Sequence, residues 1–121
     1  MISKLNLENI LFLDIETVPE EQHYNSLDDT KKALWEHKSQ YQRKEDFTAE
    51  EFYDRAGIWA EFGKIVCISV GYFTQQGETR LFRTTSFHGD EITLLKEFKN
   101  LLISHFSQSK HLLIAHNSNA F

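Results

Sequence analysis

One short stretch, Leu11–Pro19, limits what this chain can fold into. It begins as an unbroken apolar run rich in strand-forming residues, which is typical of a strand buried on both faces. Side chains two positions apart on a strand point the same way, so Asp14 and Glu16 share a face, with Cα atoms roughly 7 Å apart. Pro19 is the only proline and cannot donate to a sheet ladder, which predicts that the strand ends before it.

Two carboxylates held side by side in a buried strand repel one another, and burying unpaired charge is unfavourable. A divalent cation removes both penalties, and hard carboxylate oxygens suit Mg²⁺ or Mn²⁺. Asp14 and Glu16 are therefore candidate metal ligands. The alternative is that both lie in solvent at a strand end, because short acidic patterns of this kind are common.

The length of 121 residues and the apolar and charged fractions are those of a single ordinary globular domain. The net charge of -5 argues against a general nucleic-acid coat protein. It does not exclude a nuclease, because carboxylates at a metal site add negative charge that bound metal offsets. Cys67 is the only cysteine, so neither an intrachain disulfide nor a cysteine zinc site is expected. A signal-peptide pattern and a membrane-length apolar run are both missing, which favours a cytoplasmic protein without membrane contact.

The rest of the chain predicts two helices in an insert over about residues 20–62, then two strands, a helix and a last strand. A helix–strand crossover brings the last strand parallel to a neighbour. We therefore expect an α/β fold with a mixed sheet, in which an antiparallel meander is joined by a parallel crossover strand. The first and last strands would then be adjacent. The expected elements are strand 10–17, helices 28–43 and 48–62, strands 64–73 and 78–86, helix 90–106 and strand 111–115.

This topology places the residues just after Ala115 close to Asp14 and Glu16. Those residues, Ala115–Phe121, taken with Phe12–Thr17, resemble the DEDD, or DnaQ-like, 3′-5′ exonucleases. The segment Glu61–Gly71 is similar to the corresponding sequence in a group of predicted exonucleases, which are related to the exonuclease domain of family-B DNA polymerases. The resemblance covers nearly the whole chain from the first strand on. It implies a ribonuclease H-like fold and the release of nucleoside 5′-monophosphates from single-stranded DNA or RNA 3′ ends.

In this family, two divalent metals sit on four carboxylates. The resemblance implies catalytic and metal-binding roles for Asp14 and Glu16, with Mg²⁺ or Mn²⁺ as the cofactor. It implies substrate contacts for Thr17, His116 and Asn117. For His116, a purely structural hydrogen bond is an equal alternative.

Phe121 resembles the aromatic residue that precedes the second-motif aspartate, which would be residue 122. The third motif is missing, and Tyr24 and Asp28, which imitate its spacing, lie in the insert. We therefore expect residues 1–121 to be the N-terminal part of an exonuclease domain, C-terminally truncated and inactive alone. We also expect self-association through an uncovered C-terminal strand. One alternative is a non-catalytic nuclease-like module that binds nucleic-acid ends or a protein partner, and another is an unrelated α/β domain.

Overall fold

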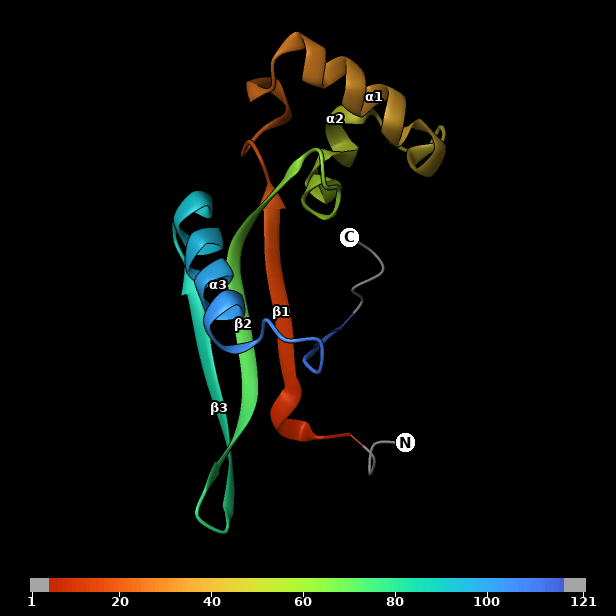
Figure 1. The fold of residues 1–121 in the computed structure, drawn as a ribbon. Coiled ribbons are helices and arrows are strands. Elements are labelled where there is room, and N and C mark those ends of the chain that lie inside the picture. Colours follow the sequence, from red (N-terminus) through yellow and green to blue (C-terminus); the bar gives the residue numbers. More distant parts are fainter. Residues whose placement is uncertain (1–4, 117–121) are drawn as a thin grey trace. The chain divides into compact units, whose positions relative to one another are not determined.

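The computed structural model describes residues 5–116 of the chain, which form α-helices, strands and short 3₁₀ turns (Figure 1). The strands are β1 (Ile10–Pro19), β2 (Gly63–Gln76), β3 (Thr79–His88) and β4 (Leu112–Ala115). The α-helices are α1 (Asp29–Arg43), α2 (Ala49–Phe52) and α3 (Glu91–His105), and the 3₁₀ turns are Leu7–Asn9, Tyr24–Ser26 and Tyr53–Ile58. Within the described residues, no helix has both the length and the apolar character that a membrane span requires.

The four strands form one mixed sheet in the order β3-β2-β1-β4. β2 and β3 pair antiparallel, from Cys67 opposite His88 to Gln76 opposite Thr79. β4 returns after α3 and pairs parallel with β1, with Leu13 opposite Ala115. The α/β class, the mixed sheet and the adjacency of the first and last strands are thus confirmed. β1 runs through Pro19 rather than ending before it, because a proline at the last strand position removes no ladder bond from the strand interior.

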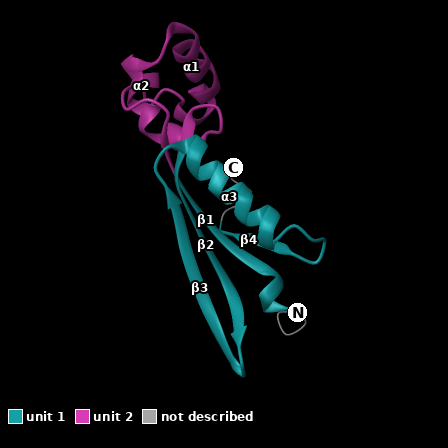
Figure 2. Ribbon diagram, turned by 60° about the vertical axis from the view of Figure 1, so that its left-hand side comes forward, with its two compact units in different colours: residues 1–16, 65–119 teal, residues 17–64, 120–121 magenta. Residues whose placement is uncertain are grey.

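Two compact units make up the described chain (Figure 2). One contains residues 5–16 and 65–116, and the other contains residues 17–64. The second unit corresponds to the insert predicted over about residues 20–62. Each unit has its own cluster of buried apolar side chains.

In the first unit, one face of the sheet packs against α3. Leu11, Ile68, Val70 and Leu94 are buried there. The sequence predicts Ile92 as a core position of this helix, which is wrong: Ile92 is 64% exposed and Leu94 is fully buried. The two residues differ by about 200° around a helix of 3.6 residues per turn. The helix sequence contains apolar residues on several sides, so periodicity alone left its rotation ambiguous.

The second unit is built around Trp35 of α1, which is fully buried. Its ring lies 5.0 Å from Phe62 and 5.8 Å from Tyr53, between ring centroids, and its Nε1–H donates to the Ala49 carbonyl. The sequence also predicts Leu34 and Tyr41 on the buried side of this helix, which is wrong, because Leu34 is 40% and Tyr41 78% exposed. α1 buries only the narrow line of Trp35 and Ser39, one turn apart.

The predicted second helix is also shorter than expected. Thr48 caps it by accepting the Glu51 N–H at 3.1 Å, but α2 ends at Phe52 and the chain continues as a 3₁₀ turn. Gly57 lies in this turn, and a Cβ there would stand 3.0 Å from the Val18 carbonyl carbon. The backbone of Val18 therefore leaves little room for a side chain at this position.

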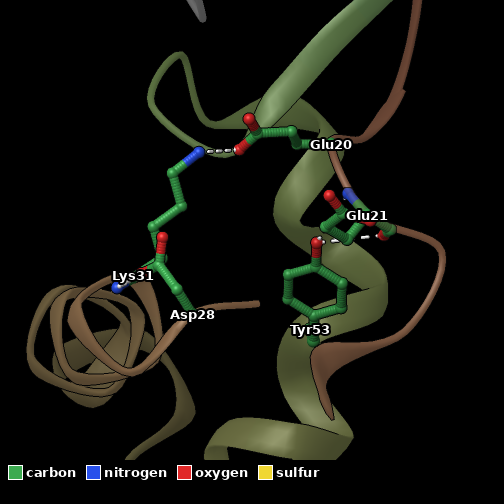
Figure 3. Close-up of polar contacts among 5 residues, drawn as sticks. All are labelled: Glu20, Glu21, Asp28, Lys31 and Tyr53. Carbon is green, nitrogen blue, oxygen red and sulfur yellow. Dashed lines mark hydrogen bonds and ion pairs between the residues drawn. The ribbon is translucent and has the colours of Figure 1, made fainter. Parts of the chain in front are cut away.

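Polar contacts hold the segment that enters the insert, and Figure 3 shows those made by Glu20 and Glu21 with Lys31 and Tyr53. The Glu20 N–H donates to the Phe62 carbonyl at 2.7 Å. The Tyr53 hydroxyl donates to the Glu21 carbonyl at 3.0 Å and accepts from the Glu21 N–H at 3.1 Å. Lys31 forms an ion pair with Glu20. The first contact joins the entering and leaving segments of the second unit, and the others connect the entering segment to the 3₁₀ turn and to α1.

Replacing Tyr53 with Phe tests this junction. Burial raises the pKa of the Tyr53 hydroxyl above its ordinary value of 10.0. The protonated hydroxyl therefore stabilises the fold below about pH 10, and this contribution is lost as the pH rises through the folded-state pKa. We expect Tyr53→Phe to lower the free energy of unfolding by about 1–2 kcal/mol at neutral pH, because both hydrogen bonds disappear. The variant should also lose less stability than the parent above about pH 10.

Urea unfolding followed by tryptophan fluorescence measures this effect. Both tryptophans of the chain, Trp35 and Trp59, lie in the second unit. Equal stabilities of the parent and Tyr53→Phe at neutral pH would contradict the assignment.

The residue after α1 offers a test in the opposite direction. Lys44 has φ 50° and ψ -132°, a backbone conformation that suits glycine. We expect Lys44→Gly to raise the free energy of unfolding by about 1 kcal/mol, because relief of backbone strain exceeds the entropic cost of glycine. Lys44→Ala is the matched control, since it removes the same side chain but keeps Cβ. An alanine variant at least as stable as the glycine variant would refute the strain.

Candidate functional site

Asp14 and Glu16 lie on the sheet face opposite α3. Both are exposed, whereas Ile15 between them is half-buried and packs towards the α3 core. The shared face is therefore confirmed. Burial on both faces is confirmed for Ile10 and Leu11 at the start of the strand, but not from Asp14 onwards. Burial falls along β1 from its start: Ile10 and Leu11 are 1% exposed, and alternation between exposed and half-buried residues begins at Asp14.

The change in burial coincides with the end of strand pairing. Ala115, the last residue of β4, is opposite Leu13 of β1. Asp14 is thus the first residue of β1 beyond its paired segment with β4. From Asp14 onwards, β4 no longer covers this side of β1. The oxygens of both carboxylates can therefore reach water or an ion.

An open depression of about 730 Å³ lies on this same face. All four strands contribute to its lining, and Asp14 and His116 are both part of it. The prediction that the residues following the last strand lie near Asp14 is therefore confirmed for His116. The lining residues are Phe12, Leu13, Asp14, Ser69, Val70, Gly71, Phe82, Thr84, Ser86, Ile114, Ala115 and His116.

Three phenylalanines give this face an aromatic surface that the sequence analysis did not identify. The Phe12 ring lies 6.2 Å from Phe73 and 6.0 Å from Phe82, between centroids. Gly71 leaves room for the Phe82 ring, since a Cβ at Gly71 would be 2.3 Å from the Phe82 Cζ. The sequence held one signal for this surface. Phe12 lies two positions from Asp14, and Gly71 two positions from Phe73, so each pair shares a face of its strand. Assigning these positions to one face required knowing that the face is not covered by α3.

The polar part of the lining is mostly neutral. The Ser69 and Ser86 hydroxyl oxygens lie 2.9 Å apart on paired positions of β2 and β3. The Cys67 Sγ lies 3.8 Å from the Ser69 Oγ and is half-buried. Asp14 is the one carboxylate among the lining residues. Its carboxylate therefore shares the depression with neutral hydroxyl groups.

The remaining candidates are less closely grouped. Thr17 is half-buried and, by strand alternation, points away from the face that Asp14 and Glu16 share. Asn117 and Phe121 lie outside the described residues. Within residues 5–116, no group of three or more His, Cys, Asp and Glu side chains is arranged to hold a metal ion. The described chain therefore brings two carboxylates together but no third ligand.

Tyr24 and Asp28, which imitate the third exonuclease motif, serve the fold of the second unit. Asp28 caps α1, and its Oδ1 accepts the Lys31 N–H at 2.7 Å. The Tyr24 ring packs edge-on against Tyr53, with centroids 6.0 Å apart. Neither residue contributes to the depression that contains Asp14.

Comparisons with protein-family models, with curated proteins and with solved structures give no match for this chain.

The carboxylate pair predicts an unusual response to mutation. We expect Asp14→Asn to leave the free energy of unfolding unchanged or to raise it by up to about 0.5 kcal/mol, because it removes repulsion between like charges on one strand face. Asp28→Asn is no suitable control, since asparagine also caps helices, whereas Asp28→Ala should cost about 1 kcal/mol. Thermal and urea unfolding of both variants measure the contrast. A loss of 1 kcal/mol or more in Asp14→Asn would give this side chain a structural role instead.

Proposed function

We propose that this chain supplies the first-motif carboxylates of a metal-dependent 3′-5′ exonuclease with a ribonuclease H-like fold. The observation that carries the proposal is the position of Asp14 and Glu16. They share an exposed face of β1, at the point where pairing with β4 ends and beside the depression that His116 also lines. The mixed α/β sheet is compatible with a ribonuclease H-like arrangement.

The donor chemistry fits a hard divalent cation. Two carboxylates offer oxygen ligands, which Mg²⁺ and Mn²⁺ prefer. Within residues 5–116, neither Asp14 nor Glu16 forms an ion pair, so no cation of the described chain neutralises them. When bound at such a pair, a metal supplies an activated water and stabilises the leaving 3′ oxygen of the terminal phosphodiester. Asp14 and Glu16 would hold it, and His116, which lines the same depression as Asp14, would contact the nucleic-acid 3′ end.

A single-stranded end of DNA or RNA is the substrate class that suits this proposal. A terminal nucleotide must separate from its neighbour to bring its phosphodiester to the two carboxylates, and single strands do so most easily. The product is a nucleoside 5′-monophosphate. Two ligands alone hold Mg²⁺ weakly, because this ion retains its waters and demands good geometry. We therefore propose that the 121-residue chain by itself has no useful exonuclease activity.

A second candidate is a non-catalytic nuclease-like module that binds nucleic-acid ends or a protein partner. The observation in its favour is that, in the part of the chain that the structure describes, no three or more His, Cys, Asp and Glu side chains are grouped to hold a metal ion. Metal binding and substrate cleavage separate the two candidates.

Calorimetric titration with Mn²⁺ is the direct test. We expect weak binding by the parent and a loss of affinity of about tenfold or more in Asp14→Ala, because one of two charged ligands is gone. Glu78→Ala is the matched control: it removes an exposed carboxylate from the β2–β3 turn and should leave affinity unchanged. Equal affinities in the parent and Asp14→Ala would contradict the metal site.

Activity is followed on a 3′-labelled single-stranded oligonucleotide in Mn²⁺. No release of mononucleotides is expected from the 121-residue chain. Release that disappears in Asp14→Ala would show that the chain completes the catalytic site by itself, and would refute the inactivity stated above.

A further inference from the structure

Phe82 of β3 exposes an aromatic ring on the sheet face opposite α3. The side chain is 52% exposed, although β3 pairs with β2 both before and after this residue. Its ring covers Gly71 of β2, where an added Cβ would stand 2.3 Å from the ring Cζ. Glycine at position 71 therefore gives the ring its place on the sheet, and the part of the ring that faces away from Gly71 is open.

Two further phenylalanines fix the orientation of this ring. The Phe73 and Phe12 rings lie 4.9 Å and 6.0 Å from the Phe82 ring, between centroids, at interplanar angles of 53° and 73°. Both neighbours therefore meet Phe82 at a tilt or with an edge, and within residues 5–116 no aromatic ring stacks on it. A ring that is held from beneath and from its sides can accept a stacked group at little further cost in side-chain entropy.

The polar groups around Phe82 are of the kinds that contact a sugar–phosphate backbone. Thr84 and Ser86 follow Phe82 at alternate positions of β3 and line the same depression as Asp14. Arg80 precedes Phe82 by two residues, so strand alternation puts it on the same face, and it is exposed. Neither β2 nor β3 contains an acidic residue. This part of the face therefore offers hydroxyl groups and a cation to a phosphate, without a carboxylate that would repel it.

We propose that this surface binds a single-stranded nucleic acid, with one nucleobase stacked on Phe82 and a phosphate paired with Arg80. Sites for single strands combine positive charge with aromatic side chains on which bases stack. Phe12 adjoins Phe82 and lies two residues from Asp14, about 7 Å along β1. The stacked base therefore belongs to a nucleotide near the 3′ end. The position of that 3′ end rests on the proposed nuclease function, whereas the stacking on Phe82 does not.

Fluorescence anisotropy with a 5′-labelled single strand of thymidine nucleotides is the first test. It is run in EDTA, so that failure of the Asp14 metal site leaves the test intact. The expected dissociation constant is on the order of 10⁻⁵ to 10⁻⁴ M, as for non-specific nucleic-acid binding. A strand of the same length without bases should bind about fivefold more weakly or worse, because it cannot stack.

Two results of this titration would overturn the proposal. Equal affinity for the base-free strand would leave a contact with the backbone alone. No binding of either strand up to about 1 mM would leave the surface to another occupant, such as an apolar protein segment. Mn²⁺ binding that depends on Asp14 would stand in both cases, so the two proposals can fail separately.

Substitutions of Phe82 locate the stacked base. Phe82→Ala and Phe82→Leu should each weaken binding of the thymidine strand about fivefold or more, because both remove the ring and leucine keeps an apolar side chain. Tyr41→Ala is the matched control: it removes another exposed aromatic ring, from α1, and should leave the affinity unchanged. Parent affinity in Phe82→Leu would contradict stacking on this residue.

The two arginines of β3 form a matched pair for the phosphate contact. Arg80→Ala should lower the slope of log dissociation constant against log salt concentration by about 0.7, the value for one phosphate of a single strand. Arg83→Ala removes the same charge from the same strand, but alternation points this side chain to the opposite face, so the slope should not change. An unchanged slope in Arg80→Ala would overturn the phosphate contact.

Backbone amide NMR of the unmodified chain gives a readout that needs no variant. Binding of the thymidine strand should shift the signals of Gly71 and Phe82, because a base stacked on the ring changes the ring-current field at both amides. The signal of Tyr41 should stay in place. Unchanged signals of Gly71 and Phe82 when the strand is bound would overturn the proposal even if every variant failed to fold.

Discussion

Strand alternation along β1 is the constraint on which the first unit depends. Odd-numbered residues such as Leu11 and Ile15 point into the core beneath α3, and Phe12, Asp14 and Glu16 point to the opposite face. A shift of register by one residue would place both carboxylates in the core and expose the leucines. Burial of the odd-numbered side chains therefore fixes the carboxylates on the open face, without any contact made by the carboxylates themselves.

The parallel pairing of β1 with β4 sets where along that face a site can form. Pairing covers Ile10–Leu13 and stops just before Asp14. Backbone groups within the paired segment bond to β4, whereas the residues beyond it are open on that side. His116 follows β4 at the same level, so two segments about a hundred residues apart in the chain meet beside one depression. The site is a consequence of where the shorter strand ends.

Local patterns predicted much of this arrangement. The caps at Thr48 and Asp90, the order of strands and helices, and the parallel return of the last strand follow from short-range signals and crossover rules. Features that depend on the three-dimensional arrangement were not predictable. The exposure of Tyr41 and the burial of Leu94 depend on how far each helix rotates against its neighbours. The contact of Phe82 over Gly71 depends on a register that the sequence does not state.

The acidic residues of the two units differ in whether they contact a partner within the described chain. In the second unit, Asp28 caps α1, Glu20 pairs with Lys31, and Glu61 pairs with Lys38. Each of these three carboxylates therefore has a hydrogen-bond or ion-pair partner in its own unit. Asp14 and Glu16 stand together on one face, and within residues 5–116 neither forms an ion pair. Their exposure fits the solvent alternative as well as the metal site proposed above, and the repulsion between them is the property that a bound cation would relieve.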